Sequence, residues 1–200
     1  MGMRIAGLVV CCLSLSLNAR PVSYSGGSTL MAFSDSAKQS VYFHYSPTYK
    51  YSLGVEAVRG VHPDRDYSYL RFTYLLNRKN TQHSQRNIYF QSGVSPEGTG
   101  HHFYGLHGDW ETRRWFAGFG HKEVAAEPRD YSEQYVQLGV APYLGEYGDL
   151  HTWLMVKTRR NTLLGGWSTY PVLKFFKGNF LIELGYSDAA GEDVHIMYRF

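Results

Sequence analysis

Three residues near the start of the chain have the side chains that nucleophilic catalysis requires. His44 and Ser46 flank Tyr45, so in an extended strand they project from the same face. Glu56 lies on the next alternating segment. A serine hydroxyl becomes a nucleophile when a histidine takes its proton and a carboxylate orients that histidine. His44, Ser46 and Glu56 are therefore catalytic candidates, although they also fit the simpler interpretation of polar residues beside the turn at Pro47.

Two further groups of titratable side chains could activate water or bind a metal. Asp64 and Asp66 form an acidic pair, and Asp149 with His151 forms an acid–imidazole pair. His101, adjacent to His102, lies roughly 20 Å from His107 along a strand, while neighbouring residues point to opposite faces. We therefore expect no metal site at these histidines, and we expect no cofactor.

The segments that carry these side chains alternate apolar and polar residues, which is the pattern of a β-strand. Turn residues such as Pro, Gly, Asn and Asp separate successive segments, and no stretch after residue 20 keeps a helical period for ten residues. The pattern predicts an all-β, antiparallel chain of about twelve strands. Eight or ten strands are alternatives because the first two segments are short. The expected strands lie near residues 28–34, 40–46, 49–59, 67–77, 86–94, 101–111, 113–121, 132–143, 150–159, 168–176, 179–187 and 193–200.

The amino-acid composition supports this fold class and excludes several functions. The chain has 17 Tyr, 11 Phe, 4 Trp and 21 Gly, and charged residues make up only 18%. Aromatic residues are scarce in disordered chains and favour strands over helices. The 20 basic and 17 acidic residues are mixed along the chain and give a net charge of +3, so there is no basic stripe for nucleic acid.

The first residues have the features of a secretory signal peptide. Arg4 precedes an uncharged apolar run over residues 5–17, which is too short to span a bilayer, and small residues follow up to Ala19. Cys11 and Cys12 lie inside this run, so cleavage would leave a chain without cysteine. We predict a signal peptide over 1–19, a short N-terminal segment over 20–27 and one β-domain over 28–200.

The last strand identifies the kind of β-domain. Val194, Ile196, Tyr198 and Phe200 share one face and end the chain on an aromatic residue. This pattern resembles the C-terminal assembly signal of bacterial outer-membrane β-barrel proteins. The resemblance implies a closed transmembrane barrel in a Gram-negative outer membrane, in contact with lipid, and delivered by periplasmic chaperones to the barrel assembly machinery. Aromatic residues near the strand ends agree, because such rings favour the lipid headgroup level.

If the apolar face points outward, the polar face lines a lumen. The predicted lumen-facing residues are Lys50, Glu56, Arg71, His107, Asp109, Arg114, Lys157, Lys174, Glu183 and Arg199. Their mixed charges favour a network of ion pairs that fills or narrows the interior, or a narrow, porin-like passive pore for small solutes. The basic residues on the late strands suggest a slight preference for small anions. We expect a monomer without catalytic activity, and the short connections argue against an adhesion protein.

Two enzyme families supply alternatives to the non-catalytic interpretation. His44, Ser46 and Glu56 resemble the His-x-Ser pair and partner Glu of the lipid A 3-O-deacylase barrels, which implies a lipid-modifying hydrolase. The acidic pair at residues 64–66 with Asp149 and His151 resembles the site of omptin proteases, in which water is activated between two pairs.

Overall fold

A computed structural model describes residues 21–61, 64–98, 100–127, 129–146, 148–188 and 191–200. The expected signal peptide lies outside these residues. None of the described residues forms a helix long and apolar enough to cross a bilayer. The strands are β1 (Gly27–Ser34), β2 (Lys38–Thr48), β3 (Tyr51–Val61), β4 (Asp64–Asn80), β5 (Ser84–Val94), β6 (His102–Thr112), β7 (Trp115–Ala125), β8 (Tyr131–Val140), β9 (His151–Asn161), β10 (Gly165–Lys177), β11 (Phe180–Ser187) and β12 (Gly191–Arg199).

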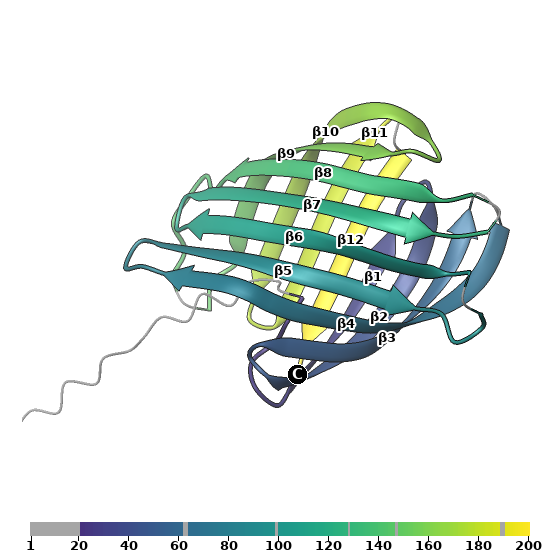
Figure 1. Cartoon of the computed structure of the whole chain (residues 1–200). Coiled ribbons are helices and arrows are strands. Elements are labelled where there is room, and N and C mark those ends of the chain that lie inside the picture. Colours follow the sequence, from purple (N-terminus) through teal and green to yellow (C-terminus); the bar gives the residue numbers. More distant parts are fainter. Residues whose placement is uncertain (1–20, 62–63, 99, 128, 147, 189–190) are drawn as a thin grey trace, which may run out of the picture.

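The twelve strands close into one antiparallel barrel (Figure 1). Each strand pairs with its sequence neighbours, and β1 pairs with β12 in a register that sets Leu30 opposite Tyr198. Closure gives every strand a hydrogen-bonded neighbour on both sides, so the sheet has no open edge. The prediction of an all-β barrel with twelve strands is confirmed, and the alternatives of eight and ten strands are excluded.

Strand ends differ from the prediction where local chemistry changes the pairing. β4 was expected over 67–77 but runs over Asp64–Asn80. At its start it pairs with the end of β3, where Asp64 is opposite Val61, and near its end a register shift between Leu75 and Asn77 lets pairing with β5 continue. β8 was expected to reach residue 143 but ends at Val140. Pro142 lacks the N–H that a continued ladder needs.

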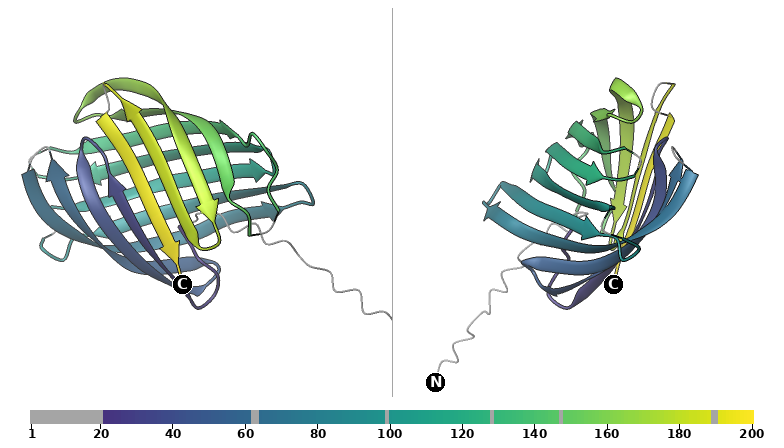
Figure 2. Two further views of the ribbon diagram at one scale, coloured as in Figure 1. Left: turned by 180° about the vertical axis from the view of Figure 1, so that it is seen from behind. Right: turned by 45° about the vertical axis from the view of Figure 1, so that its right-hand side comes forward.

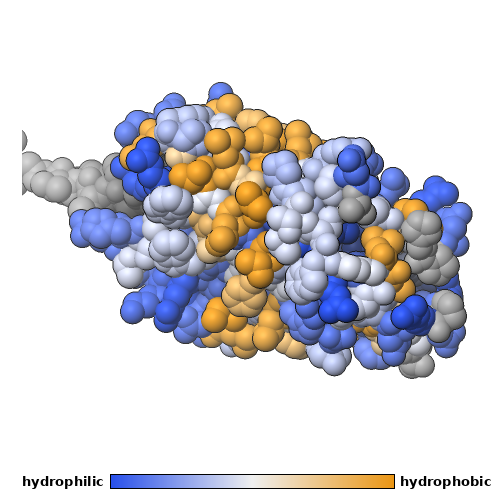
Figure 3. All heavy atoms as spheres, turned by 90° about the horizontal axis from the view of Figure 1, so that it is seen from above, coloured by the Kyte–Doolittle hydropathy of each residue, from blue (hydrophilic) through white to orange (hydrophobic). Residues whose placement is uncertain are grey.

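The outer surface of the barrel is apolar around its middle. Val55, Leu70 and Val156 each remain more than half exposed although they lie well inside their strands. Apolar side chains gather across the middle of the face drawn in Figure 3, and hydrophilic ones lie toward its ends. The alternation along each strand therefore directs its apolar set outward, as in barrels that are solvated by lipid.

The two ends of the barrel are distinguished by the turns they carry. One end, which we call the terminal end, carries Phe200, the N-terminal segment 21–26 and the turn residues 49–50, 81–83, 113–114, 141–146, 148–150 and 178–179. The other end, which we call the opposite end, carries the connecting residues 35–37, 95–98, 100–101, 126–127, 129–130 and 162–164. Exposed aromatic rings mark both ends. Tyr45, Tyr74, Trp110, Trp115 and Tyr198 lie toward the terminal end, and Tyr104, Trp167 and Tyr186 lie toward the opposite end.

Part of the interior, near the terminal end, is packed with apolar side chains. Met31, Phe176, Leu181 and Met197 belong to a buried cluster on β10–β12 and β1. These strands run obliquely across those on the far side of the barrel (Figure 2). Glycine permits close approach of neighbouring strands on the inner face: a Cβ on Gly54 would collide with the Phe43 carbonyl oxygen.

Candidate functional site: the charge-bridged lumen

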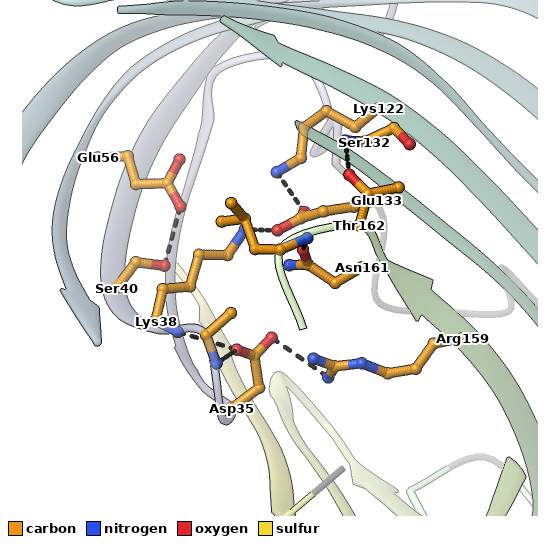
Figure 4. A network of polar contacts seen from close by, with 12 residues as sticks. Asp35, Lys38, Ser40, Glu56, Lys122, Ser132, Glu133, Arg159, Asn161 and Thr162 are labelled. Carbon is orange, nitrogen blue, oxygen red and sulfur yellow. Dashed lines mark hydrogen bonds and ion pairs between the residues drawn. The ribbon is translucent and has the colours of Figure 1, made fainter. Parts of the chain in front are cut away.

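An ion-paired group joins opposite walls of the barrel. Lys38 Nζ of β2 lies 2.6 Å from Glu133 Oε1 of β8, and Lys122 Nζ of β7 lies 2.9 Å from Glu133 Oε2. β2 and β8 are as far apart around the ring as two strands can be. The three side chains converge inside the barrel (Figure 4). The carboxylate of Glu133 therefore closes a bridge across the lumen between two cations.

A second bridge starts in the turn between β1 and β2. Asp35 Oδ2 lies 3.2 Å from Arg159 Nη1 of β9. Asp193 Oδ2 of β12 accepts from Lys157 Nζ at 2.6 Å and from Tyr170 Oη at 2.7 Å. Arg159 also lies 3.9 Å from Asp193 Oδ1, which links the two acidic residues. Residues from the β1–β2 turn, β9, β10 and β12 thus form one continuous network.

Glu56 takes part in a third group, on β2–β4. Its carboxylate accepts from Ser40 Oγ at 2.9 Å and from Arg71 Nη1 at 2.9 Å. The guanidinium of Arg71 also lies 4.0 Å from the ring centre of Tyr42 and 5.2 Å from that of Phe103. A guanidinium on an aromatic face keeps a favourable contact without water. Both charges of this pair are therefore compensated inside the barrel.

Smaller polar contacts continue around the interior. Lys174 Nζ lies 2.9 Å from Glu183 Oε1, and Asn87 Nδ2 donates to Asp109 Oδ1 at 2.7 Å. The hydroxyl of Tyr135 is 2.6 Å from His107 Nδ1. Most of the charged residues that line the lumen therefore have a partner on another strand.

A cavity of about 290 Å³ remains between these groups. Its lining contains acidic and basic side chains in equal number: Asp35, Glu56, Asp109, Glu111, Glu133, Glu183 and Asp193 against Lys38, Arg71, Lys122, Lys157, Arg159, Arg160 and Lys174. Lys157 and Lys174, which suggested a basic excess, are each paired with an acid. This lining has no formal excess of either charge.

Both ends of the lumen are narrowed by protein. At the terminal end the chain enters the barrel, where Val22 packs with Leu75 and Tyr89. The backbone N–H of Ser23 donates to Ser46 Oγ at 2.9 Å, and Ser52 Oγ donates to the Pro21 carbonyl oxygen at 2.9 Å. At the opposite end an apolar cluster lies inside the rim, formed by Val58, Tyr69, Phe103, Val124 and Tyr131.

Some of the residues predicted to face the lumen line the cavity, and others lie in turns or at the end of the barrel. Lys50 and Arg114 lie in exposed turns at the terminal end and line no part of the cavity. Each fell inside an expected strand whose observed start is two residues later, which moves the side chain into a turn. Arg199 is buried in β12 at the terminal end. The remaining predicted residues, Glu56, Arg71, His107, Asp109, Lys157, Lys174 and Glu183, line the cavity.

Sequence reasoning missed the residues that make the bridges: Asp35, Lys38, Lys122, Glu133 and Asp193. A signal was available for part of the set, because Lys122 and Glu133 occupy inward positions that are opposite each other in the β7–β8 register. The expected strand ended at residue 121 and hid this match. Nothing in the sequence pattern indicates that Lys38 reaches Glu133 across the lumen.

The structure does not bring the three candidate catalytic residues together as a triad. His44 and Ser46 do project from the same inward face, and both are fully buried. Glu56 contacts Ser40 and Arg71, not His44, because it lies opposite Tyr42 in the β2–β3 register. Within the described part of the chain, neither ring nitrogen of His44 has a hydrogen-bond partner. Ser46 therefore has no oriented base.

The other titratable groups do not assemble either. Asp64 and Asp66 lie at the opposite end of the barrel, whereas Asp149 and His151 lie at the terminal end. His101 is buried beside Tyr67, with the two rings 5.7 Å apart. In the described residues, no group of three or more His, Cys, Asp or Glu is placed to hold a metal ion.

Comparison with known proteins adds no relative: no family model matches the chain, and no curated protein matches it. The closed barrel with its apolar exterior is compatible with outer-membrane barrel proteins in general.

Proposed function

We propose that this protein is an integral outer-membrane barrel that acts without catalysis, as a narrow passive pore for small hydrophilic solutes. The observation that supports it most is the polar, charge-balanced lumen crossed by the Lys38–Glu133 ion pair. A polar lumen inside an apolar exterior is typical of membrane barrels, and charged groups that narrow the lumen set the size of the solute.

The proposal includes the location and the partners of the barrel. The exposed apolar belt requires lipid, because a surface of this kind in water would aggregate. The strand that ends at Phe200 closes the barrel against β1 and carries the aromatic face that the barrel assembly machinery would read. Each strand already has two neighbours, so the sheet needs no second copy, and we propose a monomer.

The function is tested by recording single-channel currents of the refolded protein in planar bilayers. We expect a small conductance with little preference between small cations and anions, since the lining is balanced. Lys38→Ala should raise the conductance several-fold, because it removes one bridge and leaves Glu133 paired with Lys122. Arg59→Ala is the matched control: Arg59 contacts Asp64 at 3.8 Å on the exposed rim, so its loss should leave the conductance unchanged.

Three outcomes would separate the alternatives. Absence of current from both the native protein and Lys38→Ala would reject the pore and leave a closed structural barrel. Equal currents from Lys38→Ala and the native protein would reject the bridge as the narrow point. Loss of lipid A acyl groups in cells that express the barrel, abolished by Ser46→Ala, would instead support the hydrolase.

A further inference from the structure

The two ends of the barrel differ in the sign of their exposed charge. At the terminal end, basic residues outnumber acidic ones among the exposed side chains that the structure describes: Lys50, Lys79, Arg86, Arg113, Arg114 and Lys177 against Glu146 and Asp149. At the opposite end, acidic residues such as Asp64, Asp66 and Glu97 predominate. The terminal end is therefore the one suited to a negatively charged surface.

The β4–β5 hairpin concentrates this positive charge. Lys79 and Arg86 are directly opposite each other in the β4–β5 register, and both are exposed on the outer face. Like charges in paired positions repel each other and destabilise a hairpin. Within the described residues, no acidic side chain forms an ion pair with either of them.

On the inner face of the same hairpin, the cation has hydrogen-bond partners within the protein. Arg78 Nε donates to Asn87 Oδ1 at 2.7 Å, and Asn87 in turn donates to Asp109 at 2.7 Å. The inward cation is thus connected to a carboxylate of the protein. The outward pair has no such connection, so its compensating charge must come from outside the barrel.

Trp110 fixes the level at which this charge lies. In the β5–β6 register Trp110 is the partner of Arg86, and its ring is exposed on the outer face. Leu106 projects from the same outer face of β6 as Trp110 but lies nearer the middle of the strand, and it belongs to the exposed apolar belt around the barrel. Tryptophan rings favour the headgroup level of a bilayer. Lys79, Arg86 and Trp110 therefore form one row at the border of the apolar belt.

We propose that Lys79, Arg86 and Trp110 form a docking site for the phosphate group of an anionic phospholipid in the leaflet that surrounds the terminal end. The inference rests on the proposed insertion into a membrane and goes beyond it by naming a lipid class and its contacts. The two cations bind the phosphate oxygens from adjacent strands, which removes their mutual repulsion. The Trp110 ring covers the glycerol region just inside the headgroup.

The site is tested with the complete barrel refolded into phosphatidylcholine vesicles that contain a spin-labelled lipid. The motionally restricted fraction of label should be several-fold larger for phosphatidylglycerol than for phosphatidylcholine. Lys79→Gln and Arg86→Gln should each lower this preference by about fivefold at low salt. Arg59→Gln with Arg65→Gln removes two exposed cations from the opposite end, and this control should keep the preference.

The outcomes distinguish failure of the site from failure of the proposed function. A barrel that inserts, migrates differently on a gel without boiling, yet restricts both lipids equally would overturn the docking site alone. A barrel that does not insert would overturn the proposed function. Inorganic phosphate, added at constant ionic strength, should not displace the lipid; displacement would assign the site to a free anion and reject the lipid.

Discussion

The interior of this barrel is narrowed by two different means, in regions that we call its charged side and its apolar side. Between β2 and β8 the walls are joined by charged side chains, with Glu133 held between Lys38 and Lys122. On the apolar side, which is the half of β10–β12 and β1 near the terminal end, the inner face is filled by side chains such as Leu181 and Met197, which have no exposed surface. Further along the same strands, Lys174, Glu183 and Asp193 belong to the charged groups. The stability of the charged side requires each charge to keep its ion-pair partner. The stability of the apolar side depends on how completely the side chains fill the space between the strands.

This difference separates the part of the lumen that can open from the part that cannot. An ion pair across the lumen can exchange its partner for water and ions, at a cost that depends on its surroundings. A close-packed apolar wall has no alternative partner, and a void in it loses contacts outright. Passage through the barrel should therefore follow the charged side, and the apolar side should act as a fixed wall.

The largest expected effect comes from removing the shared acid of the charged side. Glu133→Gln leaves Lys38 and Lys122 facing each other without a carboxylate, and we expect the free energy of unfolding to fall by about 3–5 kcal/mol. Urea titration of the refolded barrel measures it. The control replaces Glu133 by Leu together with Lys38→Met and Lys122→Met, which should recover most of the loss. No recovery would mean that the charges do more than neutralise each other.

The apolar side should respond to volume instead of charge. Leu181→Ala creates a cavity at a fully buried position, and we expect a loss of about 3 kcal/mol. Leu184→Ala is the matched control on the same strand, because Leu184 faces outward and its truncation leaves no enclosed cavity. The same urea titration compares them. Equal losses at the two positions would contradict the assignment of Leu181 to a packed wall.

The smallest effect is expected where the N-terminal segment meets the barrel. Ser46→Ala leaves the N–H of Ser23 without its acceptor, at a cost of about 1 kcal/mol. Amide hydrogen exchange at Ser23 and Val22 should become faster, while exchange in the β7–β8 ladder stays unchanged. Ser25→Ala removes an exposed hydroxyl that donates to Pro47, and it should change neither. If Ser46→Ala left exchange at Ser23 unaltered, the contact would have no role in holding this segment.

The fold could be predicted from the sequence because alternation, turn residues and aromatic strand ends are local signals. The twelve expected segments correspond in order to the twelve strands. The errors lie at strand ends, as at β4, where a register shift extends pairing by residues that have no alternation of their own. Lys50 is a second error at a strand end. The expected strand began at residue 49, but β3 begins at Tyr51, so Lys50 lies in the turn before it.

The lumen could be predicted only in part. Glu56, Arg71 and Lys174 line the cavity. Their positions follow from alternation along a single strand, which is a local signal. The bridge between Lys38 and Glu133 depends on how strands far apart in the ring approach each other, and no periodicity in the sequence encodes that distance. Glu56 shows the same limit: its position beside Arg71, away from His44, is a property of register.

The seam between β1 and β12 has a consequence for the rate of folding. Thr29 pairs with Arg199, so the ring closes only when the first and last strands of the chain meet. The Lys38–Glu133 contact spans 95 positions, so it too must wait for a large loop to close. Loop-closure entropy must be overcome before such contacts contribute any energy, which makes topologies of this kind slow to fold. Closure at this seam should therefore be the late, rate-limiting event, and a chain truncated before β12 should accumulate as an open sheet whose edge strands recruit other chains.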